Sequence, residues 1–270
     1  MSVFKNKLST LLLPLRIFLF LGKGNLFSAE RIQILATSYR VLWSIVRGNR
    51  KAAVLQLWFQ NTPVSVVLES SADFALIREV FLDEEYKHEK REGVKNIFDV
   101  GANVGVASLY FHILYPQATV YAFEPDPLLF QKLAERVSGI PQIKPLQIAL
   151  GDSNGEVLFY RHKGSPLAGS LLKRSEDETP FSVVSRTISS IVTELSIDAI
   201  DILKFDIEGA ERMLFASQSD REFAQFLIGE AHLDLLAMDK IEFQKLFPNH
   251  NCTYVRQTTE SRYIVHIYRP

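Results

Sequence analysis

Cysteine is nearly absent from the sequence, because Cys252 is the only one among 270 residues. It cannot form a disulfide within the chain, so a disulfide-stabilised fold is excluded and a reducing, cytoplasmic location is expected. A zinc site built on several cysteines is excluded for the same reason. The net charge is only −1, and 47% of the residues are hydrophobic. This composition excludes a disordered or collagen-like chain and indicates an ordinary globular protein of one or two domains.

Acidic residues are scarce in the first 60 positions, which contain nine lysines and arginines and a single acid, Glu30. The other 210 residues contain 21 basic and 30 acidic residues. Apolar residues recur at helical spacing over residues 29–59, with arginines between them, which predicts one or two basic amphipathic helices. These helices could pack as a cap on the following domain or contact a membrane surface. We therefore expect a basic helical extension over residues 1–60 and a second domain over residues 61–270.

No apolar run is long enough to cross a bilayer. The run over residues 8–21 would span about 21 Å as a helix, against roughly 30 Å of hydrocarbon. It is also interrupted by Pro14 and carries Arg16. The residues that follow it, 22–25, make a poor signal-peptide cleavage site. The expected location is therefore cytoplasmic, with a peripheral membrane position as the alternative.

From Lys95 onward, strand and helix patterns alternate. Strands are predicted at residues 96–100, 119–123, 143–148, 156–160, 200–205 and 226–230, and helices at 104–114, 127–137, 188–195, from 209, and at 237–246. Residues 253–257 and 263–268 predict a final antiparallel pair. The polar stretch over residues 161–180 predicts a loop that could act as a lid. This alternation predicts an α/β fold with a mostly parallel sheet, which binds ligands beyond the carboxyl ends of its strands.

A glycine turn follows the strand at residues 96–100. Asp99 is followed by Gly101 and Gly105, a Gly-x-x-x-Gly spacing instead of the Gly-x-Gly-x-x-Gly of dinucleotide sites. A pyrophosphate on a helix N-terminus is disfavoured by an acid beside it. Asp99 instead favours a ligand that carries positive charge, such as an ammonium or sulfonium group.

Further polar residues follow the next two strands. Glu124 comes 25 positions after Asp99, near the offset of an acid that holds a ribose diol. A carboxylate there would repel a 2′-phosphate. Leu150 and Asp152 follow the third strand, where Leu150 could pack on an adenine and Asp152 could accept from its amine. A simple turn before a hairpin is the alternative for Asp152.

Three acids cluster after the strand at residues 200–205: Asp206, Glu208 and Glu211. Their mutual repulsion predicts a cationic ligand or a partner such as Lys204. We expect a role in the site for Asp206 and Glu208. Glu211 is expected only to favour the N-terminus of the following helix.

Taken together, the turn at residues 99–105, the Phe123-Glu124-Pro125 sequence and the stretch at residues 203–211 resemble the FkbM-type S-adenosylmethionine-dependent methyltransferases. The resemblance extends from about Asp73 to the C-terminus. It implies a class I, Rossmann-like methyltransferase fold with a seven-stranded, mostly parallel sheet, and S-adenosylmethionine as methyl donor. It also implies a hydroxyl acceptor on a sugar, glycan or secondary metabolite. The cofactor-binding residues expected in all are Asp99, Gly101, Ala102, Asn103, Gly105, Glu124, Pro125, Leu150 and Asp152.

The chemistry expected is an in-line attack of the acceptor oxygen on the methyl group, aided by a base. The candidates for the base are Asp206, Glu208, Glu230 and His232. The last two point to the same face of a strand, and His232 has a suitable unperturbed pKa of ~6.5. A metal-free site is favoured over Mg²⁺ held by Asp206, Glu208 and Glu230. An NAD-dependent oxidoreductase and a non-catalytic, membrane-associated binding module are the alternative functions, and no nucleic-acid partner is expected.

Overall fold

The computed structural model describes residues 14–17, 19–21, 29–47, 53–68, 70–162 and 165–270. The chain divides into two units, Met1–Lys87 and His88–Pro270. The boundary expected at residue 60 falls in the turn of a hairpin of the first unit, between Phe59 and Thr62. Part of the apolar run, residues 8–13, and the candidate cleavage site at residues 22–25 lie outside the described residues.

The first unit contains α2 (Ala29–Val46), β1 (Ala53–Phe59), β2 (Thr62–Leu68), α3 (Ser71–Ile77) and the π-helical turn η1 (Arg78–Leu82). The helix expected over residues 29–59 is confirmed for α2 but wrong for β1. Burial alternates along β1, with Leu55, Leu57 and Phe59 buried, which is the period of a half-buried strand. In the turn, Gln60 and Asn61 both have positive φ, 48° and 64°, as in tight hairpin turns. The N-terminal extension is therefore of mixed helix and strand.

No helix within the described residues has the length and apolar character needed to cross a bilayer. The contact of residues 1–60 with a membrane surface stays a prediction.

The second unit is built on a seven-stranded sheet in the order β12-β13-β11-β10-β3-β4-β5. In this sheet β13 runs opposite to the other six strands, which all run in one direction. This confirms the α/β class I methyltransferase fold with its mostly parallel sheet and antiparallel C-terminal pair. The strands are β3 (Asn96–Val100), β4 (Thr119–Phe123), β5 (Ile143–Leu146), β10 (Ile202–Phe205), β11 (Phe226–His232), β12 (Asn251–Thr259) and β13 (Arg262–Tyr268).

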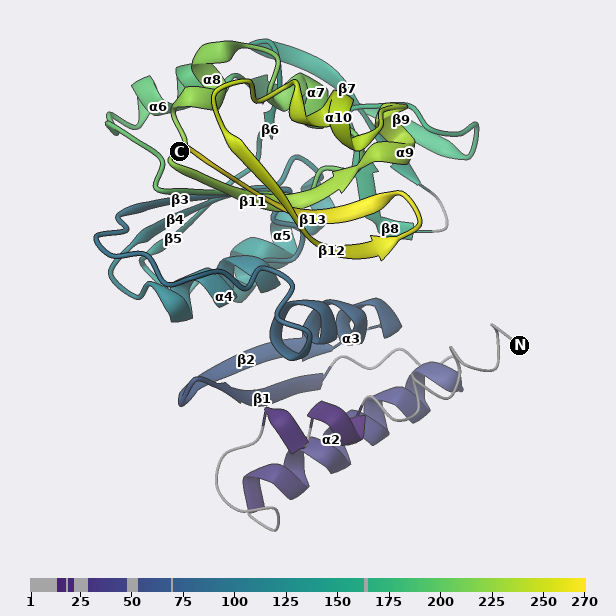
Figure 1. Ribbon diagram of the computed structural model, residues 1–270. Helices are drawn as coiled ribbons and strands as arrows, with labels where there is room; N and C mark the ends of the chain where they lie inside the picture. The colour runs from purple at the N-terminus through teal and green to yellow at the C-terminus, as the bar shows by residue number, and fades with distance from the viewer. Residues whose placement is uncertain (1–13, 18, 22–28, 48–52, 69, 163–164) are drawn as a thin grey trace. The chain divides into compact units, whose positions relative to one another are not determined.

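Helices cover both faces of this sheet (Figure 1), as the apolar central strands require. On one side lie α4 (Val106–Leu114) and α5 (Pro127–Val137), and on the other α6 (Ile188–Glu194), α7 (Glu211–Leu214), α8 (Gln218–Glu222) and α10 (Lys240–Gln244). The short α9 (Leu233–Leu236) ends at Ala237, whose φ is 50°. The helix expected over residues 237–246 is confirmed only for α10, which begins after its N-cap residue Asp239. The strand order reverses at β3 and β10, so the crevice for a ligand is expected at their carboxyl ends.

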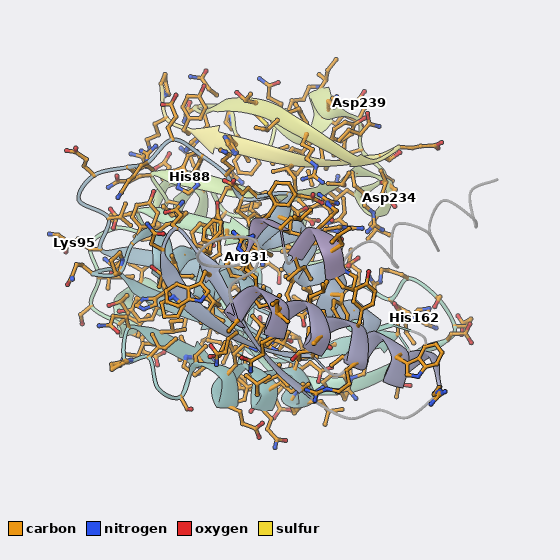
Figure 2. All side chains as sticks on the ribbon, turned by 90° about the horizontal axis from the view of Figure 1, so that it is seen from below. Arg31, His88, Lys95, His162, Asp234 and Asp239 are labelled. Carbon is orange, nitrogen blue, oxygen red and sulfur yellow. The ribbon has the colours of Figure 1, made fainter. Side chains whose placement is uncertain are left out.

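A second, four-stranded sheet has the order β6-β9-β7-β8. It comprises β6 (Ala149–Leu150), β7 (Gly155–His162), β8 (Ser165–Ser170) and β9 (Glu178–Arg186), with His162 at the end of β7 (Figure 2). The loop expected over residues 161–180 is therefore wrong in large part. Pairing with β7 orders this polar stretch, as in the pairs Tyr160 with Ser170 and Arg161 with Thr179. Such tertiary pairing overrides weak local β-propensity.

An ion pair between a buried aspartate and a partly exposed arginine joins the two sheets. Asp126, wholly buried, caps the N-terminus of α5 by accepting from the Leu128 amide. It also accepts two hydrogen bonds from Arg161 of β7, at 2.5 Å from Nε and 2.6 Å from Nη2. This bidentate contact holds the four-stranded sheet beside the carboxyl end of β4.

Candidate active site

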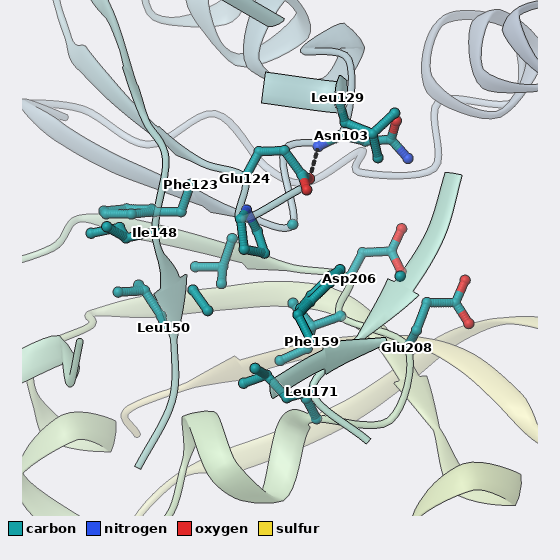
Figure 3. Close-up of a pocket in the computed structure, with 17 residues that line it drawn as sticks. Asn103, Phe123, Glu124, Leu129, Ile148, Leu150, Phe159, Leu171, Asp206 and Glu208 are labelled. Carbon is teal, nitrogen blue, oxygen red and sulfur yellow. Dashed lines mark hydrogen bonds between the residues drawn. The ribbon is translucent and has the colours of Figure 1, made fainter. Parts of the chain in front are cut away.

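A pocket lies at the carboxyl ends of β3, β4 and β10, where the strand order reverses. It encloses about 610 Å³ of empty space, its open mouth included, and residues from both sheets line it. Figure 3 shows Phe123, Ile148 and Leu150 toward one side of the pocket and Asp206 and Glu208 toward the other. The pocket is therefore apolar at one end and acidic at the other.

The glycine turn at residues 101–105 forms one wall of the pocket. Only glycine fits at its first position. Gly101 has a φ of 74°, and a Cβ atom there would lie 2.0 Å from the carbonyl oxygen of Asp206. The amides of Gly101 and Ala102 both donate to the carbonyl oxygen of Phe123, at 3.1 and 2.9 Å. The turn is thus held between the ends of β4 and β10. Asn103, with a φ of 53°, and Gly105, with a φ of 84°, complete it and lead into α4.

Glu124 lines the pocket at the end of β4 and is only 4% exposed. Its two carboxylate oxygens accept from the amides of Asn103, at 2.9 Å, and Asp126, at 2.8 Å (Figure 3 shows the first). Burial raises the pKa of Glu124 to about 7, although both hydrogen bonds oppose that shift. The carboxylate is thereby fixed in direction, and each oxygen keeps a further lone pair for a ligand.

Asp99 does not line the pocket. Its carboxylate is wholly buried, with Oδ1 2.9 Å from Lys204 Nζ and Oδ2 accepting from Ser108 Oγ at 2.6 Å. Lys204 in turn donates to the carbonyl oxygen of Gly101 at 2.8 Å. The expected contact of Asp99 with a cationic ligand is therefore replaced by an internal ion pair beneath the turn. The same pair shows that Lys204, expected to partner the acids after β10, is engaged by Asp99.

Leu150 lines the pocket, and the apolar side chains of Pro125, Leu129, Phe159 and Leu171 line it too. Asp152 is exposed, and one of its oxygens accepts from Ser153 Oγ at 3.1 Å. The structure does not bring Asp152 to the pocket, because the chain turns outward after β6 into the loop before β7.

At the acidic end, Asp206 and Glu208 follow β10 directly. Burial raises the pKa of Asp206 to about 6, although Lys204 opposes the shift. Glu208 lies 3.1 Å from Arg174 Nη1 and 3.5 Å from Arg262 Nη1, measured from Oε2. Its φ of 52° is rare outside glycine, and Ser170 Oγ holds its carbonyl oxygen at 2.9 Å. An outlier of this kind is typical of functional sites.

His232, at the end of β11, is wholly buried beside these acids. Its Nδ1 lies 2.6 Å from Glu211 Oε1, and its Nε2 lies 3.0 Å from Glu230 Oε2. Burial alone would lower the pKa of His232, but its contacts with Glu211 and Glu230 raise it well above the ordinary value. The ordinary pKa expected for a His232 base is therefore corrected. A histidine protonated at both nitrogens cannot accept a proton from an acceptor hydroxyl.

The residues of this pocket lie in a segment of the chain that matches a known protein family. Residues 99–255 match the family described as "Methyltransferase FkbM domain". The chain belongs to the FkbM methyltransferase family.

Two relatives illustrate the range of this FkbM family. The chain is 31% identical over 200 residues to 31-O-demethyl-FK506 methyltransferase FkbM of Streptomyces tacrolimicus. The match covers 58% of this chain and 74% of that relative. It is 26% identical over 170 residues to 2-O-methyltransferase NoeI of Sinorhizobium fredii, covering 52% of this chain and 70% of that one. A solved methyltransferase FkbM from Methylobacillus flagellatus KT is 19% identical with a TM-score of 0.44, over 73% of this chain. The present chain spans about half of that structure, 54%.

Membership of this family makes the chain an enzyme of the methyltransferase class and excludes the NAD-dependent oxidoreductase alternative.

Three residues of the site were not predicted from the sequence. Glu211 was expected only to favour a helix N-terminus, yet it is wholly buried and fixes His232. Arg174 lies in the stretch interpreted as a loop, and Arg262 carried no local signal. A contact between distant segments, such as Glu211 with His232, leaves no pattern in the sequence.

Proposed function

We propose that this FkbM-family enzyme transfers the methyl group of S-adenosylmethionine to a hydroxyl oxygen of a small-molecule or glycan acceptor. One observation carries the proposal: a single pocket joins Glu124, an apolar wall and the Asp206–Glu208 pair. The names of the relatives, 2-O-methyltransferase and 31-O-demethyl-FK506 methyltransferase, favour oxygen as the atom that is methylated.

The residues present fit the cofactor. Glu124 has spare lone pairs for the two hydroxyl groups of a ribose, and its direction is fixed by two amide donors. Phe123, Leu150 and Phe159 supply the apolar surface that an adenine ring needs. Gly101 lets the backbone approach a ligand closely. At the other end, the acidic side chains suit a positively charged group.

When bound, S-adenosylmethionine supplies a sulfonium-linked methyl group whose carbon–sulfur bond breaks, leaving a neutral thioether, as the acceptor oxygen forms its new bond to carbon. The role of the chain is mainly to hold the two reactants in line and to take up one proton. Among the four expected bases, Asp206 is best placed, because it lines the pocket and its side chain is 37% exposed. The hydroxyl proton passes to its carboxylate.

The other candidates are less suited to that step. Glu208 is held by two arginines. Burial would raise the pKa of Glu230, but its contacts with His232 and Thr258 lower it. We assign these residues to orienting the acceptor and to balancing charge around His232.

The proposal is tested by incubating the full chain with S-adenosylmethionine that carries a deuterated methyl group and a panel of sugar, glycan and polyketide alcohols. Mass spectrometry is expected to find the labelled methyl group on an acceptor oxygen, and Asp206→Asn is expected to lower the rate by about 10²-fold or more. The matched control Asp198→Asn changes an exposed aspartate on the surface. A label found only on nitrogen or carbon, or a full rate in Asp206→Asn, would contradict the proposal.

A further inference from the structure

Three polar side chains converge at the acidic end of the pocket. Asp206 and Glu208 come from the turn after β10, and His232 comes from the end of β11. Asp206 Oδ1 lies 3.7 Å from His232 Nε2, and Glu208 Oε2 lies 3.8 Å from the same nitrogen. One atom from each of the three residues lies within 4.8 Å of the others. Side chains of this kind at this spacing are the usual ligands of a divalent cation.

The histidine supplies an observation independent of the acids. Its side chain is wholly buried, and Nε2 makes no hydrogen bond, since Glu230 Oε2 lies close at 3.0 Å but outside hydrogen-bonding geometry. A buried nitrogen that is aimed at two carboxylates and held only by this ion pair can exchange its proton for a cation.

The opposite nitrogen of the ring is arranged as in known metal sites. Glu211 Oε1 lies 2.6 Å from Nδ1, and both groups are wholly buried. A carboxylate on one nitrogen fixes the orientation of the ring, and once an ion replaces the proton on Nε2 the lone pair of that nitrogen points toward the ion. Glu211, which the sequence did not single out for the site, thus gains a function as a positioning residue.

The distances suit an ion of ordinary size. Two ligand atoms that each lie about 2.1 Å from one ion can be at most about 4.2 Å apart. The two distances from Nε2, 3.7 and 3.8 Å, are within that limit. Asp206 is partly exposed, 37%, so its carboxylate has room to adjust. Glu208 Oε2 keeps its contacts with Arg174 and Arg262 and would bind the ion through a second lone pair.

The charges also leave a place for a cation. Four carboxylates surround His232, those of Asp206, Glu208, Glu211 and Glu230. Among the basic side chains described there, Arg174 and Arg262 both contact Glu208, and Lys204 acts on Asp206. A divalent ion at Nε2 would neutralise the remaining carboxylates more completely than one proton does.

We propose that Asp206, Glu208 and His232 hold a divalent cation of the Mg²⁺ and Mn²⁺ class at the acidic end of the pocket. The donor set differs from the one expected from the sequence, because His232 takes the place of Glu230. The role of the ion rests on the proposed function: its open positions would bind the acceptor oxygen and lower the pKa of the hydroxyl group. Asp206 binds through Oδ1, which leaves Oδ2 to take up the proton.

Binding of the metal alone tests the site. The full chain is treated with EDTA, freed of chelator, and titrated with Mn²⁺, while electron paramagnetic resonance measures the free ion. We expect one tight ion per chain. Asp206→Asn, Glu208→Gln and His232→Gln are each expected to weaken binding at least about tenfold. Glu194→Gln, which changes an exposed glutamate of α6, is the matched control and should bind as the wild type does.

The outcomes separate the alternatives. Absence of saturable Mn²⁺ binding, or equal binding by the wild type and by Asp206→Asn and Glu208→Gln, would overturn the cation site. Because His232 is buried, its variant is first checked for folding by thermal unfolding, and the two partly exposed carboxylates decide the question if it does not fold. A large effect of Glu230→Gln with none from a folded His232→Gln would overturn the assigned donor set.

Failure of the cation site is distinguishable from failure of the proposed function. S-adenosylhomocysteine binding is measured by calorimetry in EDTA, without any metal. A chain that binds S-adenosylhomocysteine but no Mn²⁺ refutes the cation site and keeps methyl transfer. A chain that binds Mn²⁺ but not S-adenosylhomocysteine refutes the proposed function and keeps the site.

Discussion

Lys204 and Asp99 are cross-strand partners on β10 and β3, and their side chains meet in a buried ion pair of 2.9 Å. Through this pair the chain supports the glycine turn from below, since Lys204 also donates to the carbonyl oxygen of Gly101. Asp99 acts on the pocket through its partner and not by touching a ligand.

Removing the charge of Asp99 should therefore destabilise the fold. Asp99→Asn leaves Lys204 buried without its counter-charge, which costs about 3 kcal/mol or more of unfolding free energy. The double variant Asp99→Asn with Lys204→Met removes both charges and should regain a large part of that loss. Urea unfolding measures both. If the double variant is less stable than Asp99→Asn by a further loss of similar size, the two side chains do not stabilise the fold as a pair.

Gly101 and Gly93 give a matched pair of substitutions. Both have positive φ, 74° and 70°, but a Cβ atom would meet Asp206 backbone at position 101 and open space at position 93. Gly93→Ala should cost about 1–2 kcal/mol, the price of a left-handed alanine. Gly101→Ala should cost at least about 2 kcal/mol more, because only a backbone shift relieves the contact. Equal losses of unfolding free energy in the two variants would show that the turn is not packed against β10.

Glu124 should make stability depend on pH. Its pKa is about 7 in the folded chain, above the ordinary value of about 4.3. Between these values the folded state keeps a proton that the unfolded state has lost, so the contribution of this group to stability falls as pH rises from about 4.3 to about 7. In Glu124→Gln this dependence is absent. Urea unfolding of both proteins at pH 5 and pH 8 should show the wild type losing stability relative to the variant, and parallel losses would contradict this account.

Arg161 should affect ligand binding in the pocket without lining it, because its contact with Asp126 holds the four-stranded sheet in place. Arg161→Ala is expected to lower both stability and the affinity for S-adenosylhomocysteine, because Phe159 and Leu171 reach the pocket from that sheet or its connection. Arg161→Lys should restore only part of both, since a lysine cannot make the bidentate contact. Thermal unfolding and calorimetry measure the two effects. Full function in Arg161→Ala would show that the sheet is held by other contacts alone.

Those parts of the site that consist of short local sequence patterns could be predicted from the sequence. The turn after β3, Glu124 after β4 and the acids after β10 all follow apolar strands, and strands in a parallel sheet end at one edge. Their gathering in one pocket follows from that rule. The parallel centre of the larger sheet was predictable for the same reason, because each of its central strands is an apolar run bounded by turn residues. Its number of strands was expected only from the family resemblance.

The remainder depends on contacts that sequence patterns do not contain. Asp99 was expected to face a ligand, but its partner lies 105 positions away on a strand whose neighbour is known only from the fold. Glu211 and His232 meet between α7 and β11 in the same way. The strand at residues 165–170 forms because β7 pairs with it, although its own residues lack a β pattern. The same pairing with β7 extends the segment expected at residues 182–187 into a strand over residues 178–186.

The central claim, that this pocket holds the methyl donor, is tested most directly by calorimetric titration of the full chain with S-adenosylhomocysteine. We predict one binding site per chain, with affinity reduced at least about tenfold in Glu124→Gln and unchanged in Glu135→Gln, an exposed glutamate of α5. No saturable binding by the wild type, or equal affinity in Glu124→Gln, would contradict it.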